Sequence, residues 1–313
     1  MAQTWQDWEL VISDDEDPPG EAWKHLNELQ KQNARVTALH SGAPHGQAAN
    51  TNRALRAARG TWLKPLHDDD VLRPDCLETL VTAARCLPSA VMVSGRIAPY
   101  RDGRPAAEAK AGRGAWLEML PQRYVHLAMY LQDCHAGVPT QVMVHRKAIE
   151  QGALFADTPG IVFSADALWN CEVLKHGDLL YVNRVVAEHH QGHETLTSQK
   201  TADRLAAEYP IVLAKVRENI DPHLHPPPFE VALGMAKCIR VFYEFKKRRF
   251  AVGFRLALGI GRLASWMLAA RWAVNQAFPD ALHAVPRIRL KGAGHPAAAG
   301  GRSASGAAKE THR

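Results

Sequence analysis

Over its first 200 residues the chain alternates short runs of β-branched and aliphatic residues with segments of helical periodicity. This alternation predicts an α/β fold, with a mostly parallel sheet flanked by helices. The expected strands are residues 8–13, 35–40, 61–66, 90–97, 140–145 and 179–188. The expected helices are residues 21–32, 46–59, 74–86, 116–132 and 163–176. After residue 193 the pattern predicts helices alone, and the last of these is a long helix over residues 250–278.

Composition and cysteine spacing exclude several classes of protein. With 46% hydrophobic and 22% charged residues, the chain is typical of a globular protein and not of a disordered one. The apolar stretch 251–278 contains three arginines, whereas a membrane-spanning helix needs about 18 uncharged residues. Five cysteines without a Cys-x-x-Cys pair exclude a disulfide framework and a cysteine zinc site. No basic and apolar leader follows Met1, so we expect a cytoplasmic protein.

The charge is distributed unevenly along the chain. The whole chain has 38 Lys and Arg against 32 Asp and Glu, and residues 228–313 hold 15 of the former and 4 of the latter. The first 227 residues are therefore acidic, and a basic arm that contains tryptophan follows them. This pattern indicates that the arm binds an anionic membrane surface and not nucleic acid. The surface would be the cytoplasmic face of the membrane.

Three consecutive aspartates, Asp68, Asp69 and Asp70, follow the expected strand 61–66. Ligands bind at the carboxyl ends of strands in open α/β sheets, so this position is one where chemistry is expected. Carboxylates this close repel one another unless a cation neutralises them, and hard oxygen donors favour Mg²⁺ or Mn²⁺. Alternatively, the aspartates cap the next helix and remain solvated.

A second acidic pair, Asp14 and Asp15, ends the first expected strand. Two acidic clusters at the ends of neighbouring strands would meet in one crevice. Taken alone, the pair is more typical of a turn.

Three segments carry a resemblance to a known family. QTWQDWELVISDD (3–15), NRALRAARG (52–60) and LHDDDVLRPD (66–75) resemble the nucleotide-sugar-binding half of the family 2 glycosyltransferases. The resemblance extends over residues 1 to 198. It implies a GT-A-like, Rossmann-like fold followed by a helical C-terminal region.

The resemblance also implies roles for the acidic residues. In that family the acidic residue that ends this strand contacts the nucleobase. The corresponding residue here is Asp14, and Asp15 lies beside it. The Asp-x-Asp region implies that Asp68 and Asp69 meet the ribose and the metal-bound diphosphate. Asp70 is an alternative metal ligand, because the register within a triplet is ambiguous.

Two later segments extend the resemblance. SADALWN (164–170) is similar to an acidic motif whose aspartate, here Asp166, serves as the catalytic base. Many members carry Glu where this chain has Ala165, and the alternative role for Asp166 is a charge that stabilises a helix N-terminus. VVAEHHQGH (185–193) is similar to a segment that supplies a metal-ligating histidine. His190 fits that register best, His189 and His193 are rivals, and a solvated or core histidine is the alternative.

Family members normally open with a further strand, a loop and a helix before the segment that begins at Gln3. Elements of ordinary size amount to roughly 25 to 30 residues, so we expect a segment of about this length to be missing before Gln3. Either Met1 is an internal methionine taken as the start, which we favour, or the chain is shortened.

The basic run KKRR (246–249) leads into the expected helix 250–278. Arg248, Arg255 and Arg262 recur every seven residues and would form one stripe on that helix. Such a stripe favours a helix lying in a membrane interface. A helix packed on the catalytic body or on a second subunit is the alternative.

We therefore expect three parts: a catalytic GT-A-like domain over 1–198, a helical basic region over 199–291, and a disordered tail over 292–313. The expected activity is metal-dependent, inverting transfer of a sugar from a nucleotide diphosphate-sugar to an acceptor hydroxyl, in polysaccharide or glycolipid synthesis. The alternative is a non-catalytic scaffold or sugar-binding component of an envelope-assembly complex. Phosphoryl transfer is disfavoured, because no phosphate-binding glycine loop or Walker-type lysine occurs.

Overall fold

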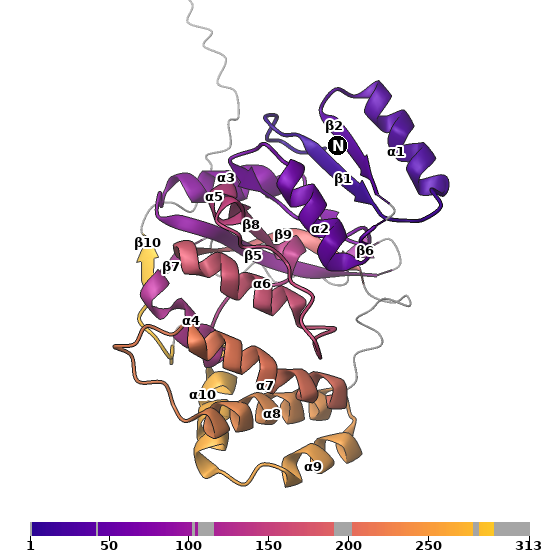
Figure 1. Ribbon diagram of the computed structural model, residues 1–313. Coiled ribbons are helices and arrows are strands. Elements are labelled where there is room, and N and C mark those ends of the chain that lie inside the picture. The colour runs from indigo at the N-terminus through magenta and orange to yellow at the C-terminus, as the bar shows by residue number, and fades with distance from the viewer. Residues whose placement is uncertain are drawn as a thin grey trace, which may run out of the picture.

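The computed structural model describes residues 2–41, 43–101, 104–105, 116–190, 202–277 and 282–290 (Figure 1). Its strands are β1 (Leu10–Asp14), β2 (Val36–His40), β3 (Trp62–Leu63), β4 (Val71–Leu72), β5 (Ala90–Arg101), β6 (Arg104–Pro105), β7 (Leu117–Leu120), β8 (Val142–His145), β9 (Asp178–His190) and β10 (Ile288–Leu290). Its α-helices are α1 (Glu21–Gln32), α2 (Gln47–Ala57), α3 (Cys76–Arg85), α4 (Gln122–Tyr130), α5 (Arg146–Glu150), α6 (Ala165–Val173), α7 (Ala202–Glu218), α8 (Phe229–Lys246), α9 (Phe250–Leu258) and α10 (Leu263–Ala277). Two 3₁₀ helices are η1 (Pro139–Gln141) and η2 (Leu174–His176).

The strands form a large sheet in the order β10-β7-β9-β5-β8-β3, while β1 and β2 pair separately. The expected α/β class is confirmed, but the sheet is mixed. Among the described strands, β5 with β9 and β1 with β2 are parallel, and the other six pairings are antiparallel. The prediction of a mostly parallel sheet fails because a short apolar run has the same pattern in either direction.

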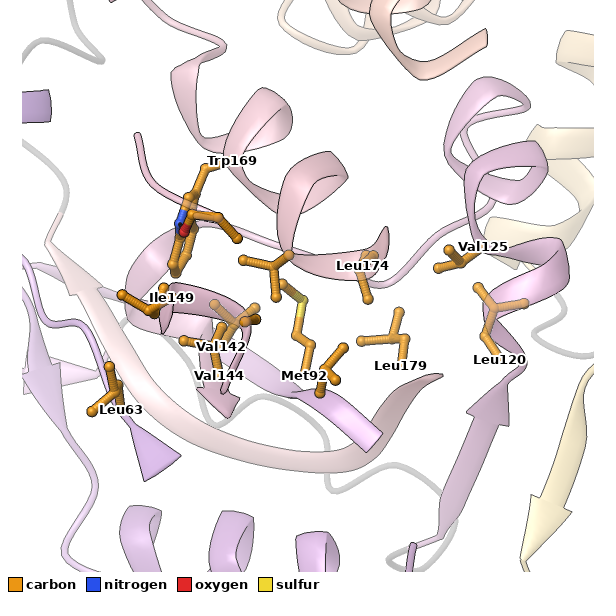
Figure 2. Close-up of a cluster of buried hydrophobic side chains, with 14 of the residues drawn as sticks. Leu63, Met92, Leu120, Val125, Val142, Val144, Ile149, Trp169, Leu174 and Leu179 are labelled. Atoms are coloured by element: carbon orange, nitrogen blue, oxygen red, sulfur yellow. Dashed lines mark hydrogen bonds between the residues drawn. The ribbon is translucent and has the colours of Figure 1, made fainter. Parts of the chain in front are cut away.

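Strands β5 and β9 lie in the middle of the sheet and are buried on both faces. Met92 of β5 and Leu179 of β9 belong to the cluster of buried side chains beneath α6, which Figure 2 shows. The next residue of each strand, Val93 or Leu180, belongs to a second cluster, beneath α3. Successive side chains of a strand point to opposite faces, so these two strands connect both halves of the core.

Two expected helices differ from the structure. Residues 117–120 of the expected helix 116–132 form strand β7 instead, and α4 begins only after Pro121. A residue that precedes proline is biased toward extended backbone, which explains why the helix cannot start earlier. The expected helix 250–278 is divided into α9 and α10 around Gly259 and Gly261. Because of this break, the arginines spaced by seven residues do not lie on one continuous helix.

The C-terminal region packs against the sheet domain. Helix α8 lies among α7, α9 and α10, and α7 contacts both α4 and α6 (Figure 1). The chain then returns to the sheet as β10, antiparallel to β7, so the expectation of helices alone after residue 193 is wrong. The expected tail, 292–313, lies outside the described residues. No described helix has both the length and the hydropathy of a membrane-spanning segment.

A buried ionic cluster fastens the segment 282–290 to the sheet domain. The side chains of Arg287 and Glu118 are each 4% exposed, and their guanidinium and carboxylate groups form an ion pair. Arg287 also donates to Oδ1 of Asp133 at 2.9 Å, and Nδ1 of His283 lies 3.5 Å from the same atom. Burial raises the pKa of Asp133. The hydrogen bond with His283 and the charge of Arg287 lower this pKa by more than burial raises it, so the net shift is downward. The hydrogen bond to Asp133 raises the pKa of His283 above 6.5.

We expect Arg287→Met to lower the free energy of unfolding by about 3–5 kcal/mol, because it leaves two buried carboxylates without their cation. Urea denaturation followed by circular dichroism measures this loss. Arg56→Met removes an exposed guanidinium and is the control, with an expected change below about 0.5 kcal/mol. Equal stability of the two variants would contradict the role given to Arg287.

The stability of the protein should also depend on the ionisation of His283. Its pKa is higher in the folded state than the ordinary value of 6.5. The stabilisation is therefore complete below pH 6.5 and is lost as the pH rises through the folded-state pKa. Denaturation at a series of pH values should show this decline in the wild type and a smaller one in His283→Gln. Identical pH profiles would show that His283 does not contribute.

Candidate active site

The loop that carries the three aspartates is anchored from behind. Nζ of Lys64 donates to the carbonyl oxygens of Pro65 at 2.7 Å and Thr140 at 2.5 Å. The hydroxyl of Thr140, which is fully buried in η1, accepts from the backbone N–H of His67 at 3.2 Å. Burial lowers the pKa of Lys64 to about 8, and the negative charge of Asp70 acts in the opposite direction. The loop after β3 is thus held against η1 by a cation next to the aspartates.

Asp70 lies at the centre of the loop's polar cluster. Its carboxylate is inaccessible to solvent, and its Oδ1 lies 2.8 Å from Nδ1 of His189. Nδ1 of His67 lies 3.9 Å from the other carboxylate oxygen. The sheet explains this meeting, because β4 pairs antiparallel with β9 so that Val71 is opposite Glu188. The residues one position further along, Asp70 and His189, are then brought opposite each other.

The cluster has the donors that a divalent cation needs. His67, Asp69 and Asp70 each offer one ligand atom, and these atoms lie within 4.8 Å of one another. Two carboxylates and an imidazole suit Mg²⁺ or Mn²⁺, and His189 would orient the carboxylate of Asp70 from behind. The residues present therefore fit a metal, and the chemistry predicted for Asp69 and Asp70 is compatible with their positions. Asp68 occupies an exposed position in the same loop.

Asp14 is the last residue of β1 and Asp15 follows it, and the two side chains have different environments. Oδ1 of Asp14 accepts from the backbone N–H of Glu16 at 3.1 Å, while its Oδ2 is buried with no hydrogen-bond partner among the described residues. Oδ2 of Asp15 accepts from the N–H of Gly46 at 2.7 Å, and the Asp15 carbonyl lies 2.8 Å from Nδ1 of His45. Asp15 therefore braces the loop before α2, and the role predicted for Asp14 stays a prediction.

Asp166 lies in the first turn of α6, as the sequence predicts. Its Oδ1 accepts from the N–H of Ala167 at 2.8 Å. The segment before it is fixed by Glu208 of α7, whose buried carboxylate accepts from the N–H groups of Val162 at 2.9 Å and Phe163 at 3.0 Å. The convergence of Asp166, Asp14 and the aspartate loop on one donor site stays a prediction.

The histidines of the site differ from those singled out in the sequence. The structure brings His189, one of the rivals, to Asp70, whereas the side chain of His190 and all of His193 lie outside the described residues. The metal-binding role predicted for His190 therefore stays a prediction. Sequence reasoning missed His67 and Lys64. The position of His67 immediately before the three aspartates was a signal that could have identified it.

Comparisons with known proteins show similarity in part of the sequence and in the fold. Residues 1–152 match the model of glycosyl transferase family 2. The uncharacterized protein y4gI of Sinorhizobium fredii is 30% identical over 92 residues, which make up 29% of this chain and only 10% of that protein. Residues 1–349 of S. aureus TarS in complex with UDP-GlcNAc match with a TM-score of 0.55 and 13% identity, over 88% of this chain and 74% of theirs. The complex of the same TarS fragment with UDP gives a TM-score of 0.51 and 13% identity, over 74% and 63%. At such identities the structures show a shared fold.

We expect the purified chain to bind Mn²⁺, and Asp70→Asn to weaken that binding at least about tenfold, because it removes a buried ligand charge. His189→Ala should have a smaller effect in the same direction. Isothermal titration calorimetry measures both, with the exposed Asp7→Asn as the matched control. If Asp70→Asn binds Mn²⁺ with wild-type affinity, the metal does not bind at this cluster.

Proposed function

We propose that this chain, whose residues 1–152 match the model of glycosyl transferase family 2 and whose fold is GT-A-like, transfers a sugar from a nucleotide diphosphate-sugar to an acceptor hydroxyl. The observation that carries the proposal is the buried Asp70 with His67, Asp69 and His189 around it, in the loop that follows β3. A group of this kind suits the binding of a diphosphate through a divalent cation. TarS, whose fold is similar, is described in complex with UDP-GlcNAc and with UDP, which supports this class of donor.

The acidic residues then have separate tasks. Asp69 and Asp70, with His67, would hold Mn²⁺ or Mg²⁺, and the bound ion would neutralise charge on the leaving diphosphate. The buried Oδ2 of Asp14 would accept an N–H of the nucleobase. A buried acceptor of this kind discriminates strongly against a base that lacks the donor. Asp68, exposed in the same loop, would contact the ribose, and Asp15 supports the site by bracing its neighbouring loop.

Asp166 would act as the general base. It would accept the proton of the acceptor hydroxyl while that oxygen forms a bond to the anomeric carbon and the bond to the diphosphate breaks. Attack from the face opposite the diphosphate inverts the anomeric configuration. We propose that the acceptor is a hydroxyl of a glycan or a lipid-linked precursor in envelope polysaccharide or glycolipid synthesis.

A screen of nucleotide diphosphate-sugars tests the proposal most directly. The readout is nucleoside diphosphate released in the presence of an acceptor mixture, with Mn²⁺ and with EDTA. Turnover with one donor that EDTA abolishes would support the metal-dependent transferase. A donor that binds in calorimetry without turnover in any acceptor mixture would favour a non-catalytic sugar-binding protein instead.

We expect Asp166→Asn to reduce kcat by about 10²–10⁴ while the KM for the donor stays unchanged, because it removes a proton acceptor and not a donor contact. Asp14→Asn should raise the KM for the nucleotide-sugar donor and leave kcat unchanged. Initial rates of nucleoside diphosphate release measure both, and Asp7→Asn is the control. An unchanged kcat in Asp166→Asn would assign the base to another residue.

A further inference from the structure

Helix α9 exposes a line of large apolar side chains. Phe250, Phe254 and Leu258 are 55%, 63% and 89% exposed. Residues four apart lie on the same side of a helix, so these three form one stripe along α9. Leu263, which is 75% exposed, opens α10 just after the intervening turn. Soluble surfaces rarely collect large apolar side chains in this way without a binding role.

The side of α9 next to this stripe packs against α8. A Cβ at Gly253 would lie 2.2 Å from a ring carbon of Phe245, so the glycine allows α9 to approach α8 closely. Leu256 and Ala257 pack against the buried cluster between α8 and α10. The ring of Phe245 also contacts Phe254, with ring centroids 5.1 Å apart. The stripe is therefore held in a fixed orientation by the core of the helical region.

The charged residues of the segment that contains α9 are almost all basic. Residues 242–277 contain seven Lys and Arg and a single acid, Glu244. Glu244 is 1% exposed and lies 2.6 Å from the guanidinium of Arg240, so it does not contribute negative charge to the surface. The run 246–249, KKRR, is exposed throughout and directly precedes Phe250. Two of these arginines are paired with acids: Arg255 forms an ion pair with Asp203 of α7, and Arg249 lies 3.9 Å from the buried carboxylate of Glu244.

We propose that this α9 surface, made of residues 246–249 with Phe250, Phe254 and Leu258, binds the headgroup region of an anionic lipid bilayer. The apolar stripe would enter the boundary between headgroups and acyl chains, and the adjacent basic run would meet the negative surface potential. A second copy of the chain is a poorer occupant, because a symmetric contact would bring two basic runs together. The helix that binds is thus α9 alone, and not the single long helix that the sequence predicts.

Vesicle flotation with the full chain tests the proposal without reference to enzymatic activity. We expect binding to vesicles of phosphatidylcholine with phosphatidylglycerol, no binding to pure phosphatidylcholine, and loss of binding at high salt. Leu258→Glu should reduce the bound fraction severalfold, because it places a carboxylate in the stripe. Its melting temperature should not change, since this side chain is almost fully exposed.

Two double variants with the same change in net charge distinguish the effect of the basic run on vesicle binding from the effect of net charge. Lys246→Gln with Lys247→Gln should weaken vesicle binding at least fivefold, whereas Lys24→Gln with Lys31→Gln, on exposed positions of α1, should not. Equal weakening by both pairs, or no binding by the wild type, would overturn the proposal. Dimerisation in light scattering that Leu258→Glu abolishes, without vesicle binding, would overturn it in favour of a second copy.

Discussion

Strand β9 is the element on which both the core and the candidate site depend. Its first half, with Leu179 and Leu180, is buried on both faces between β5 and β7. Its second half, in which Val186 and Ala187 are also buried, pairs with β4, and His189 near its end lies next to Asp70. The attraction between a buried carboxylate and an imidazole barely repays the desolvation of the charge. The burial of apolar side chains in the first half therefore fixes the register that brings the polar pair together.

Much of the fold could be predicted, because period and turn residues are local. The helix 21–32 has the predicted bounds, and β1, β2, β5, β8 and β9 each occur where a strand is expected. Strand direction could not be predicted, since it depends on which strands become neighbours and not on the pattern of one segment. The strand before Pro121 and the break near Gly259 were both indicated by residues that disfavour helix, but the apolar periodicity around them suggested a longer helix.

The site was predictable where its residues are adjacent in the sequence and not where they meet through the sheet. Three consecutive aspartates after an expected strand indicate a cation site by themselves. The meeting of Asp70 with His189 depends on β4, a strand of two residues that no periodicity can reveal. For the same reason the choice among the histidines near residue 190 required a register. The role of Lys64 depends on a buried contact with Thr140, 76 residues away in the chain.

The helical C-terminal region is part of what orients the candidate base, although its sequence pattern separates it from the sheet domain. Glu208 of α7 is 2% exposed, and its carboxylate holds two backbone N–H groups of the segment that leads into α6 and Asp166. A buried carboxylate needs hydrogen-bond donors of this kind. Separating α7 from the sheet domain would therefore break these hydrogen bonds and leave the carboxylate and both N–H groups without partners. Because α7 also packs on α8, which supports α9, the same helices connect the α9 surface to the N-terminus of α6. A boundary near residue 198 therefore divides two patterns of sequence and not two independently packed bodies.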